Sequence, residues 1–281
     1  MRVAIFGATG LLGKELVRGW KGAEVAALNS KAADIRDARR VKEVVELHRP
    51  DWIVLAAAYT DVDGCETHQE LAFEVNCQGA VNVAQAARQA QSRLLFVSTD
   101  YVFDGTKSTP YEADDPPNPR SVYGKSKAEA EGKLREILPQ CCIVRTSWLF
   151  GTGGKCFPDT ILKLAATRPT LDVVNDQRGS PTYAIDLAQA ITDLCRLQAQ
   201  GTVHVSNRGD CTWFDFARAI VRGAGLRAEV QPTTSDRFPR PAERPKHSVL
   251  SLKSLERYGL AMPEWQDALR RYLDERAHPG L

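Results

Sequence analysis

The sequence has little net charge and no long apolar run. Its 37 lysines and arginines almost balance 35 aspartates and glutamates, and the resulting net charge of +2 argues against a general nucleic-acid partner. No apolar stretch approaches the roughly 18 residues of a membrane-spanning helix, so we expect no membrane partner. The first residues, Met1 to Gly7, match a strand rather than a signal peptide, and we therefore expect a cytoplasmic protein.

Paired cysteines are also absent. The seven cysteines form no C-x-x-C pair, and none of the five histidines stands at a ligand spacing from them. This pattern indicates reduced thiols and no structural zinc, so we expect no metal. The cysteines are Cys65, Cys77, Cys141, Cys142, Cys156, Cys195 and Cys211.

The chain is long enough for one or two domains, and its first half alternates between apolar runs and amphipathic stretches. This alternation predicts an α/β fold with a Rossmann-type, doubly wound parallel sheet over residues 1–150. We expect this domain to bind NADP, and later segments of the chain can return to it. The predicted strands are 2–6, 24–28, 52–58, 94–99 and 142–150, and the predicted helices are 11–20, 41–48, 66–89 and 121–138.

The second half is less regular and contains more proline. We expect residues 151–281 to form a smaller, discontinuous C-terminal α/β domain that binds substrate. Residues 233–245, here called the arm, are rich in proline and arginine and predict an extended surface segment. The expected strands are 171–174, 202–206 and 228–230, and the expected helices are 160–166, 184–197, 213–223, 252–258 and 263–276.

The first strand runs into a glycine turn, Gly7, Gly10 and Gly13, that opens the first helix. Gly7 allows a tight turn, Gly10 allows a pyrophosphate to approach the backbone, and Gly13 allows the helix to pack against the strand. The helix N-terminus then faces the phosphates. The spacing only partly matches G-x-G-x-x-G, and a glycine-rich turn without a ligand is the alternative.

The end of the second strand carries no acid to bind the adenosine ribose. Asn29 and Lys31 stand there instead, and Lys31 is suited to a 2′-phosphate, which favours NADPH over NADH as the cofactor. The alternative is that Lys31 is simply solvated. Asp34 and Ile35 follow and are expected against the adenine edge.

Tyr123 and Lys127 lie four residues apart on a predicted helix and share one face. The lysine charge favours the phenolate, so the pattern predicts a lowered pKa for Tyr123. Thr99 ends the fourth strand, at the sheet edge where ligands bind, and is expected to bond a substrate carbonyl oxygen beside Tyr123. The alternative is a solvated helix face with no chemistry.

These motifs resemble the dTDP-4-dehydrorhamnose reductase family of extended short-chain dehydrogenases/reductases, over essentially the whole chain. The most specific stretches are Ser-Thr-Asp-Tyr-Val-Phe-Asp-Gly at 98–105 and Tyr-Gly-Lys-Ser-Lys at 123–127. Further matches lie at 56–63, 144–148, 175–182, 244–245 and 260–265.

The resemblance implies reduction of the 4-keto group of dTDP-4-dehydro-L-rhamnose, with Thr99, Tyr123 and Lys127 as the catalytic residues. Tyr123 would donate the proton, Thr99 would orient the carbonyl oxygen and Lys127 would keep Tyr123 acidic. Sugar-nucleotide 4,6-dehydratases carry Glu where this chain has Tyr101, which fits a plain reductase. The implied cofactor-binding residues are Gly7, Gly10, Leu11, Leu12, Asp34, Ile35, Ala56, Ala57, Ala58 and Tyr59.

The substrate-binding residues are less clearly marked. Arg244 in the arm is expected near the nucleotide, and Trp148 is expected to line the sugar pocket, with a core role as its alternative. Asp61 and Asp63 are candidates for substrate hydroxyls, with loop capping as the alternative. Some family members associate through acidic residues and a divalent cation. Ile185 stands where an acid is needed, so no metal is expected and a monomer or homodimer stays open.

Two other functions are compatible with the same motifs. One is a reductase of a different nucleotide 4-ketosugar. The other is a non-catalytic NADP-binding subunit, similar to the regulatory subunit of methionine adenosyltransferase.

Overall fold

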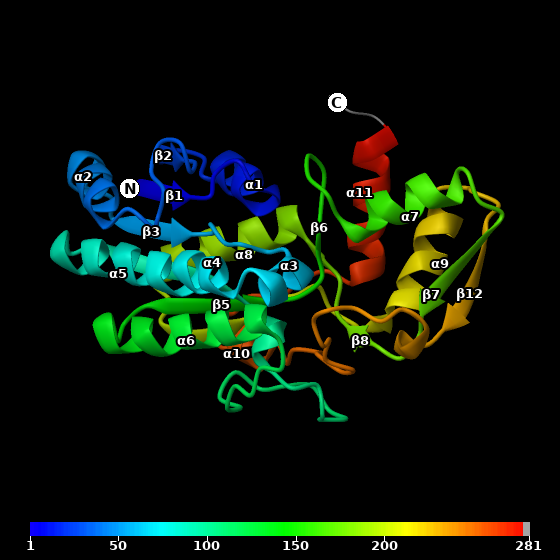
Figure 1. Ribbon diagram of the computed structural model, residues 1–281. Coiled ribbons are helices and arrows are strands. Elements are labelled where there is room, and N and C mark those ends of the chain that lie inside the picture. Colours follow the sequence, from blue (N-terminus) through cyan, green and yellow to red (C-terminus); the bar gives the residue numbers. More distant parts are fainter. Residues whose placement is uncertain (278–281) are drawn as a thin grey trace.

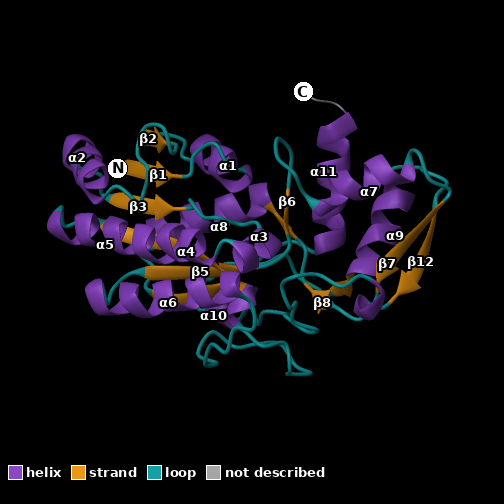
Figure 2. Cartoon of the chain, viewed as in Figure 1, coloured by secondary structure: helices purple, strands orange, loops and turns teal. Residues whose placement is uncertain are grey.

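A six-stranded parallel sheet forms the centre of the larger unit, with strand order β10-β5-β4-β3-β1-β2. The computed structural model describes residues 1–277 (Figures 1 and 2). The inner strands are almost wholly apolar because helices cover both sheet faces. The strands are β1 (Arg2–Phe6), β2 (Glu24–Leu28), β3 (Trp52–Leu55), β4 (Arg93–Thr99), β5 (Cys142–Thr146) and β10 (Gly201–His204).

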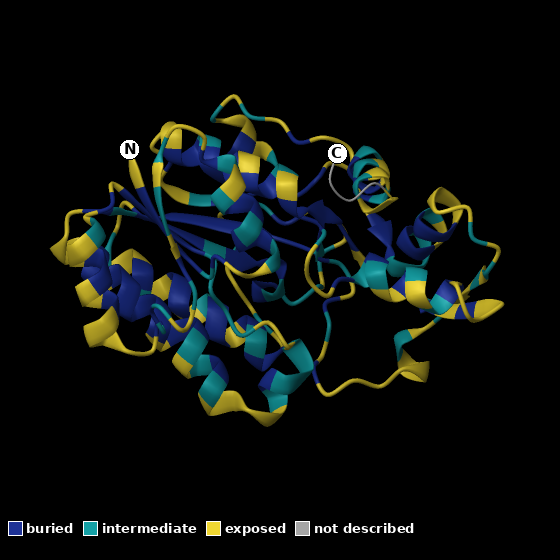
Figure 3. Cartoon of the chain, turned by 90° about the horizontal axis from the view of Figure 1, so that it is seen from above, coloured by how far each residue is buried: buried dark blue, intermediate teal, exposed yellow. Residues whose placement is uncertain are grey.

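Two helical layers enclose the sheet. On one face α1 (Leu11–Gly19) packs beside α8 (Ala184–Arg196), and on the other face α2 (Ala38–His48), α5 (Gly79–Gln89) and α6 (Val122–Ile137) pack side by side. The layers leave a buried centre and exposed outer helix faces (Figure 3). α8, β10 and α10 (Lys253–Glu256) all belong to this unit, although they come from the second half of the chain. The predicted Rossmann-type sheet is confirmed.

The smaller unit lies at the carboxyl ends of the strands (Figure 1). Its core includes Phe150, Phe216 and Tyr272, packed ring against ring. Its elements are the parallel pair β7 (Thr170–Val174) and β12 (Glu229–Thr233), the pairs β6 (Leu149–Phe150) with β9 (Thr182–Tyr183) and β8 (Arg178–Gly179) with β11 (Cys211–Thr212), and the helices α7 (Phe157–Ala165), α9 (Trp213–Gly223) and α11 (Trp265–Ala277).

Three predicted elements differ from the observed ones, one in length and two by an interruption. The third strand ends at Leu55 instead of residue 58, and the strand expected at 142–150 breaks at Trp148, which has a positive φ of 46°. The helix expected at 66–89 is broken once, because Asp61 caps a separate short helix and the chain turns at His68. The short helix is α3 (Val62–Thr67), and the helix after the break runs without interruption through α4 (Gln69–Phe73), the π-helical turn η1 (Glu74–Gln78) and α5.

Short 3₁₀ turns complete the described chain. η2 (Asp100–Val102) follows β4 directly, and η3 (Ser235–Arg237) lies in the arm. Within residues 1–277, no helix has both the length and the apolar character needed to cross a membrane.

Candidate active site

The glycine turn between β1 and α1 has no room for a side chain at Gly7 or at Gly13. Gly7 has a φ of +87°, and a Cβ there would lie 2.6 Å from the Ala57 backbone nitrogen. A Cβ on Gly13 would collide with the Gly7 carbonyl oxygen and lie 2.8 Å from the Ala8 backbone. Gly10 is the N-cap of α1, and no side chain caps the helix. The first N–H groups of α1 are therefore available to an anion.

We expect Gly13→Ala to lower the free energy of unfolding by about 2–3 kcal/mol, because its new Cβ meets backbone atoms that cannot rotate away. Gly10→Ala is the matched control, since its Cβ would lie 3.3 Å from its nearest neighbour and φ is −70°. Urea denaturation of both variants measures the difference. Equal stability of the two variants would show that the turn is not closely packed.

The turn opens into a cavity of ≈ 380 Å³ at the carboxyl ends of the strands. Thr99 enters it from the end of β4, Tyr123 and Lys127 enter it from α6, and Trp148 enters it after β5. The predicted residues that line this cavity are Gly7, Gly10, Leu11, Leu12, Gly13, Ala56, Ala58, Thr99, Tyr123, Lys127 and Trp148. The lining does not include Asn29, Lys31, Asp34, Ile35, Ala57, Tyr59, Asp61, Asp63 or Arg244.

Two of the candidate catalytic side chains, Thr99 and Lys127, are buried, the third, Tyr123, is half-buried, and all three are held in place. The Thr99 hydroxyl donates to Asp100 Oδ1 at 3.1 Å and accepts from the Tyr101 backbone N–H at 3.2 Å. Lys127 Nζ donates to the Val97 carbonyl oxygen at 2.7 Å. The Tyr123 ring packs edge-on against Tyr101, with ring centroids 5.7 Å apart. The helix therefore presents phenol and ammonium to the cavity from fixed positions.

The pKa of Tyr123 is not lowered as predicted. Burial raises it above its usual value, and the nearby Thr99 hydroxyl only partly opposes the rise. Burial also lowers the pKa of Lys127 to about 7, opposed by the charge of Glu131. The prediction of an acidified tyrosine is wrong because it counted the lysine charge and not the desolvation of both groups. A raised pKa keeps Tyr123 protonated, which suits a proton donor.

An asparagine on η1 joins the loop after β3 to α6. Asn76 Oδ1 accepts from the Tyr59 backbone N–H at 2.8 Å, and its Nδ2 donates to the Tyr59 carbonyl oxygen at 3.1 Å. The same amide donates to Ser126 Oγ at 3.0 Å, and Ser126 donates to the Tyr123 carbonyl oxygen. This role of Asn76 was not predicted from the sequence. Its signal in the sequence is the recurrence of Asn76, Gly79 and Asn82 at three-residue spacing on one predicted helix, which indicates helix packing.

The loop that follows β2 contains Lys31 and Arg36 and is held by hydrogen bonds within the protein. Asn29 Oδ1 accepts from the backbone N–H of Lys31 at 3.0 Å and of Ala32 at 2.9 Å, so its side chain holds the turn. Hydrogen bonds from Arg36 hold the pKa of Asp34 below its ordinary value. On α5, Asn82 Nδ2 donates to the Ile35 carbonyl oxygen at 2.9 Å and fixes this loop.

The two acidic residues after β3 both have partners within the protein. Asp61 Oδ1 accepts from the Gly64 N–H at 2.9 Å and caps α3. Asp63 pairs with Arg244 through bonds of 2.9 and 3.0 Å and with Arg240 at 3.3 Å. The arm is therefore attached to α3. Beside it lies a hollow of ≈ 830 Å³ whose cationic lining residues are Arg120, Arg240, Arg244 and Lys246.

Trp148 adopts a strained backbone conformation at the cavity wall. Its ring stacks on Trp213 at a centroid distance of 3.5 Å and an angle of 6°. The Gly179 backbone lies so close that a Cβ there would approach the indole at 2.5 Å. Both contacts fix the ring. Lys155 also lines the cavity and was missed, although it follows a glycine-rich loop at the same sheet edge.

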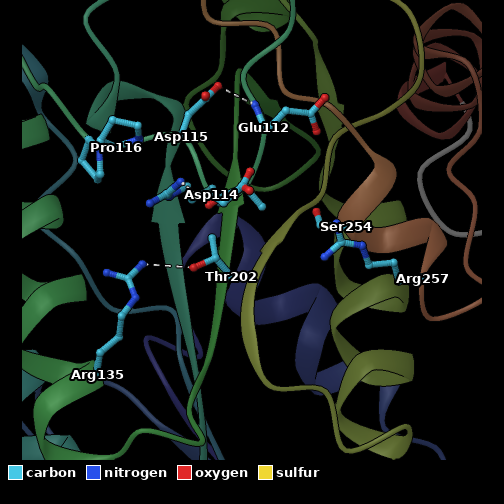
Figure 4. Close-up of a pocket in the computed structure, with 11 residues that line it drawn as sticks. Glu112, Asp114, Asp115, Pro116, Arg135, Thr202, Ser254 and Arg257 are labelled. Atoms are coloured by element: carbon cyan, nitrogen blue, oxygen red, sulfur yellow. Dashed lines mark hydrogen bonds between the residues drawn. The ribbon is translucent and has the colours of Figure 1, made fainter.

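A separate hollow of ≈ 430 Å³ lies beside β10 and shares no lining residue with the catalytic cavity (Figure 4). At its edge, Arg135 Nη2 donates to Thr202 Oγ1 at 3.0 Å. Its inner wall includes Arg145, which is 1% exposed and pairs with the buried Glu131 at 2.6 Å. Glu131 in turn accepts from Ser98 Oγ at 2.6 Å, next to Thr99.

A parallel sheet with a helix-opening glycine turn, and a Thr, Tyr and Lys group beside it, defines an oxidoreductase of the short-chain dehydrogenase/reductase class. The chain belongs to the dTDP-4-dehydrorhamnose reductase family, and the family model described as RmlD substrate binding domain matches residues 1–278. The resemblance inferred from the motifs is thereby confirmed.

Relatives match nearly the whole chain. It is 42% identical over 278 residues to the spore coat polysaccharide biosynthesis protein SpsK of Bacillus subtilis, covering 98% of each. It is 41% identical over 278 residues to the dTDP-4-dehydrorhamnose reductase of Streptomyces griseus, covering 95% of this chain and 91% of the relative. The crystal structure of dTDP-4-dehydrorhamnose reductase from Bacillus anthracis in complex with NADP matches with a TM-score of 0.95 and 39% identity, covering 98% of this chain and 99% of that one.

Proposed function

We propose that this protein reduces the 4-keto group of dTDP-4-dehydro-L-rhamnose to give dTDP-L-rhamnose, with NADPH as cofactor and NADH as the alternative. One observation carries the proposal. The cavity of ≈ 380 Å³ joins the glycine turn of α1 to Thr99, Tyr123 and Lys127. A phosphate-binding turn and a proton donor thus open into the same space, as the reduction of a carbonyl requires.

The glycine turn fits a nicotinamide dinucleotide. Side chains are excluded at Gly7 and Gly13, so the bare backbone and the uncapped start of α1 face the cavity. When bound, the cofactor supplies the hydride for the sugar carbonyl carbon. Leu11, Leu12, Ala56 and Ala58 line the cavity beside the turn. We assign to the adenosine end the residues Asn29, Lys31, Asp34, Ile35, Ala57 and Tyr59.

The three catalytic residues have separate roles in the proposal. Tyr123 donates its phenol proton to the carbonyl oxygen, and its raised pKa keeps that proton in place until reaction. Thr99 donates a hydrogen bond to the same oxygen. Lys127, fixed by the Val97 carbonyl, provides the positive charge that stabilises the phenolate left on Tyr123.

The substrate side rests on the arm and on Trp148. Two phosphates of a nucleotide sugar favour guanidinium groups, and Arg244 is the arm residue that Asp63 holds against α3. Asp61 and Asp63 serve this site by shaping α3 and holding the arm. The fixed edge of Trp148 borders the sugar.

Purified protein mixed with dTDP-4-dehydro-L-rhamnose and NADPH tests the proposal through the absorbance of the reduced nicotinamide. A fall in absorbance that depends on both components is expected. Binding of NADP without turnover would favour the non-catalytic subunit. Faster turnover of another nucleotide 4-ketosugar would replace the substrate and keep the chemistry.

We expect a KM for NADPH at least about tenfold lower than that for NADH, since one charge-assisted hydrogen bond is worth roughly 1.5–3 kcal/mol. The physical reason is the absence of a carboxylate at Asn29 and the presence of Lys31. Lys31→Gln should reduce the preference, and Lys21→Gln, an exposed lysine after α1, is the control. A preference for NADH, or equal effects of both variants, would contradict the assignment of Lys31.

A further inference from the structure

A buried carboxyl group lies directly behind the catalytic threonine. Asp100 begins η2, is 2% exposed and lines the catalytic cavity. Its Oδ1 accepts the Thr99 hydroxyl at 3.1 Å. Its Oδ2 is buried and has no hydrogen-bond partner among the described residues. A buried ionised oxygen without a partner is costly, so the site favours a neutral carboxyl group.

The hydrogen bonds of Thr99 conflict with its proposed role. A hydroxyl carries one proton and can accept two further bonds. Thr99 already accepts from the Tyr101 N–H at 3.2 Å, and its single proton points to Asp100. In this state it has no proton left for a substrate carbonyl oxygen. A neutral Asp100 can instead donate to Thr99 Oγ1, and the threonine proton is then free.

We propose that Asp100 is a positioning residue whose neutral carboxyl group turns the Thr99 hydroxyl toward the substrate carbonyl oxygen. The proposal rests on the role of Thr99 given under the proposed function. With Asp100 neutral, Thr99 accepts from Tyr101 and Asp100 and donates to the substrate, so all its bonding capacity is used. With Asp100 ionised, the substrate oxygen loses one of its two donors.

The surroundings of Asp100 extend its neutral form to higher pH, so that this form predominates below about pH 6. Burial raises the pKa of Asp100 to about 6, opposed by the nearby hydroxyls of Ser248 and Thr99 and by the backbone N–H groups of Asp100 and Tyr101. The titratable groups that face it are Tyr101 of η2 and Tyr123 of α6, while Lys127 of α6 lines the same cavity. Beyond Tyr101 lies the ion pair of Arg244 from the arm with Asp63 from α3.

The pH dependence of kcat/KM tests the proposal, because both Asp100 and Lys127 must carry protons. The pKa values of about 6 and about 7 predict that kcat/KM falls about a hundredfold per pH unit above both. Asp100→Asn keeps an N–H donor beside Thr99 and cannot ionise. This variant should retain turnover at pH 6. Its kcat/KM should fall only about tenfold per pH unit above the pKa of Lys127, because Lys127 alone then loses a proton.

Asp104→Asn is the matched control for this substitution. Its carboxylate accepts from Thr106, Tyr111 and Asn118, and these bonds outweigh burial and hold the pKa of Asp104 well below the usual range. Asp104→Asn should therefore keep the hundredfold fall of kcat/KM per pH unit. The result that overturns the proposal is a folded Asp100→Asn protein with the hundredfold slope, or with no turnover at any pH.

A second variant and a measurement without substrate separate this proposal from the proposed function. In Thr99→Val, which has no proton to direct, adding Asp100→Asn should change kcat/KM less than twofold. A carbon NMR titration of the Asp100 carboxyl group, assigned by its loss in Asp100→Asn, should have its midpoint near pH 6. A midpoint below about 4 would overturn the role of Asp100. Failure of the native protein to oxidise NADPH would instead overturn the proposed function.

Discussion

Tyr123→Phe should lower kcat by about 10²–10⁴-fold and leave the affinity for NADPH nearly unchanged. The phenylalanine ring keeps the edge contact with Tyr101 at 5.7 Å, so the fold of α6 has no reason to change. The lost hydroxyl is the only group that we assign as proton donor. Steady-state oxidation of NADPH measures kcat, and a fluorescence titration of NADPH measures binding.

The control for this prediction removes a tyrosine hydroxyl elsewhere. Tyr258 donates to the Gln200 carbonyl oxygen at 3.0 Å and does not line the catalytic cavity, so Tyr258→Phe should keep its kcat. Because burial raises the pKa of Tyr123, the loss of activity at alkaline pH should follow Asp100 and Lys127 and not the phenol. Full activity of Tyr123→Phe would sink the assigned mechanism.

Features that depend on local spacing were accessible from the sequence. The glycine turn follows its strand directly, and the interval from Tyr123 to Lys127 is one helical turn, so residue spacing alone was enough to locate both. The parallel sheet followed from the alternation of apolar runs and amphipathic helices. Each of these inferences needs only neighbours within a few residues or one repeated pattern.

Features that depend on distant contacts were not accessible. The pair of Asp63 with Arg244 joins residues 181 positions apart, and no pattern in either segment identifies the partner. The break at Trp148 depends on Trp213 and Gly179, which belong to other elements. The predicted direction of the pKa shift at Tyr123 was wrong for the same reason, because burial is a property of the whole cavity and not of a helix face.

Arg145→Met should lower the free energy of unfolding by about 3–5 kcal/mol, the cost of leaving a buried charge without its partner. Arg145 donates to Glu131 through Nε at 2.9 Å and Nη2 at 2.6 Å, and both side chains are at most 1% exposed. Urea denaturation measures the loss. Arg135→Met is the matched control, because Arg135 binds the same carboxylate with a side chain that is 42% exposed, and its loss should cost less than about 1 kcal/mol.

The pH dependence of the free energy of unfolding shows whether the lost charge of Arg145 causes the loss of stability. Burial alone would raise the pKa of Glu131, but the bonds from Arg145 and Ser98 outweigh it and lower the pKa below its ordinary 4.5. The native pair therefore contributes stability above pH 4.5, and this contribution is lost as the pH falls through the folded value. In Arg145→Met, Glu131 keeps only the exposed Arg135 as a cationic partner and takes up a proton more readily. The difference in the free energy of unfolding between this variant and the native protein should therefore shrink toward acid pH.

The double variant Glu131→Gln with Arg145→Met distinguishes a charge effect from a packing effect. Removing both charges leaves no uncompensated ion in the core, so the double variant should be more stable than Arg145→Met alone. A purely geometric role for the arginine, as a filler between β5 and α6, would instead make the two losses add. Since Ser98 donates to Glu131 at 2.6 Å and precedes Thr99, the same ion pair also fixes the strand end that carries the proposed catalytic threonine. If kcat of Arg145→Met falls by more than its fraction of folded protein does, the excess measures how far the ion pair positions Thr99.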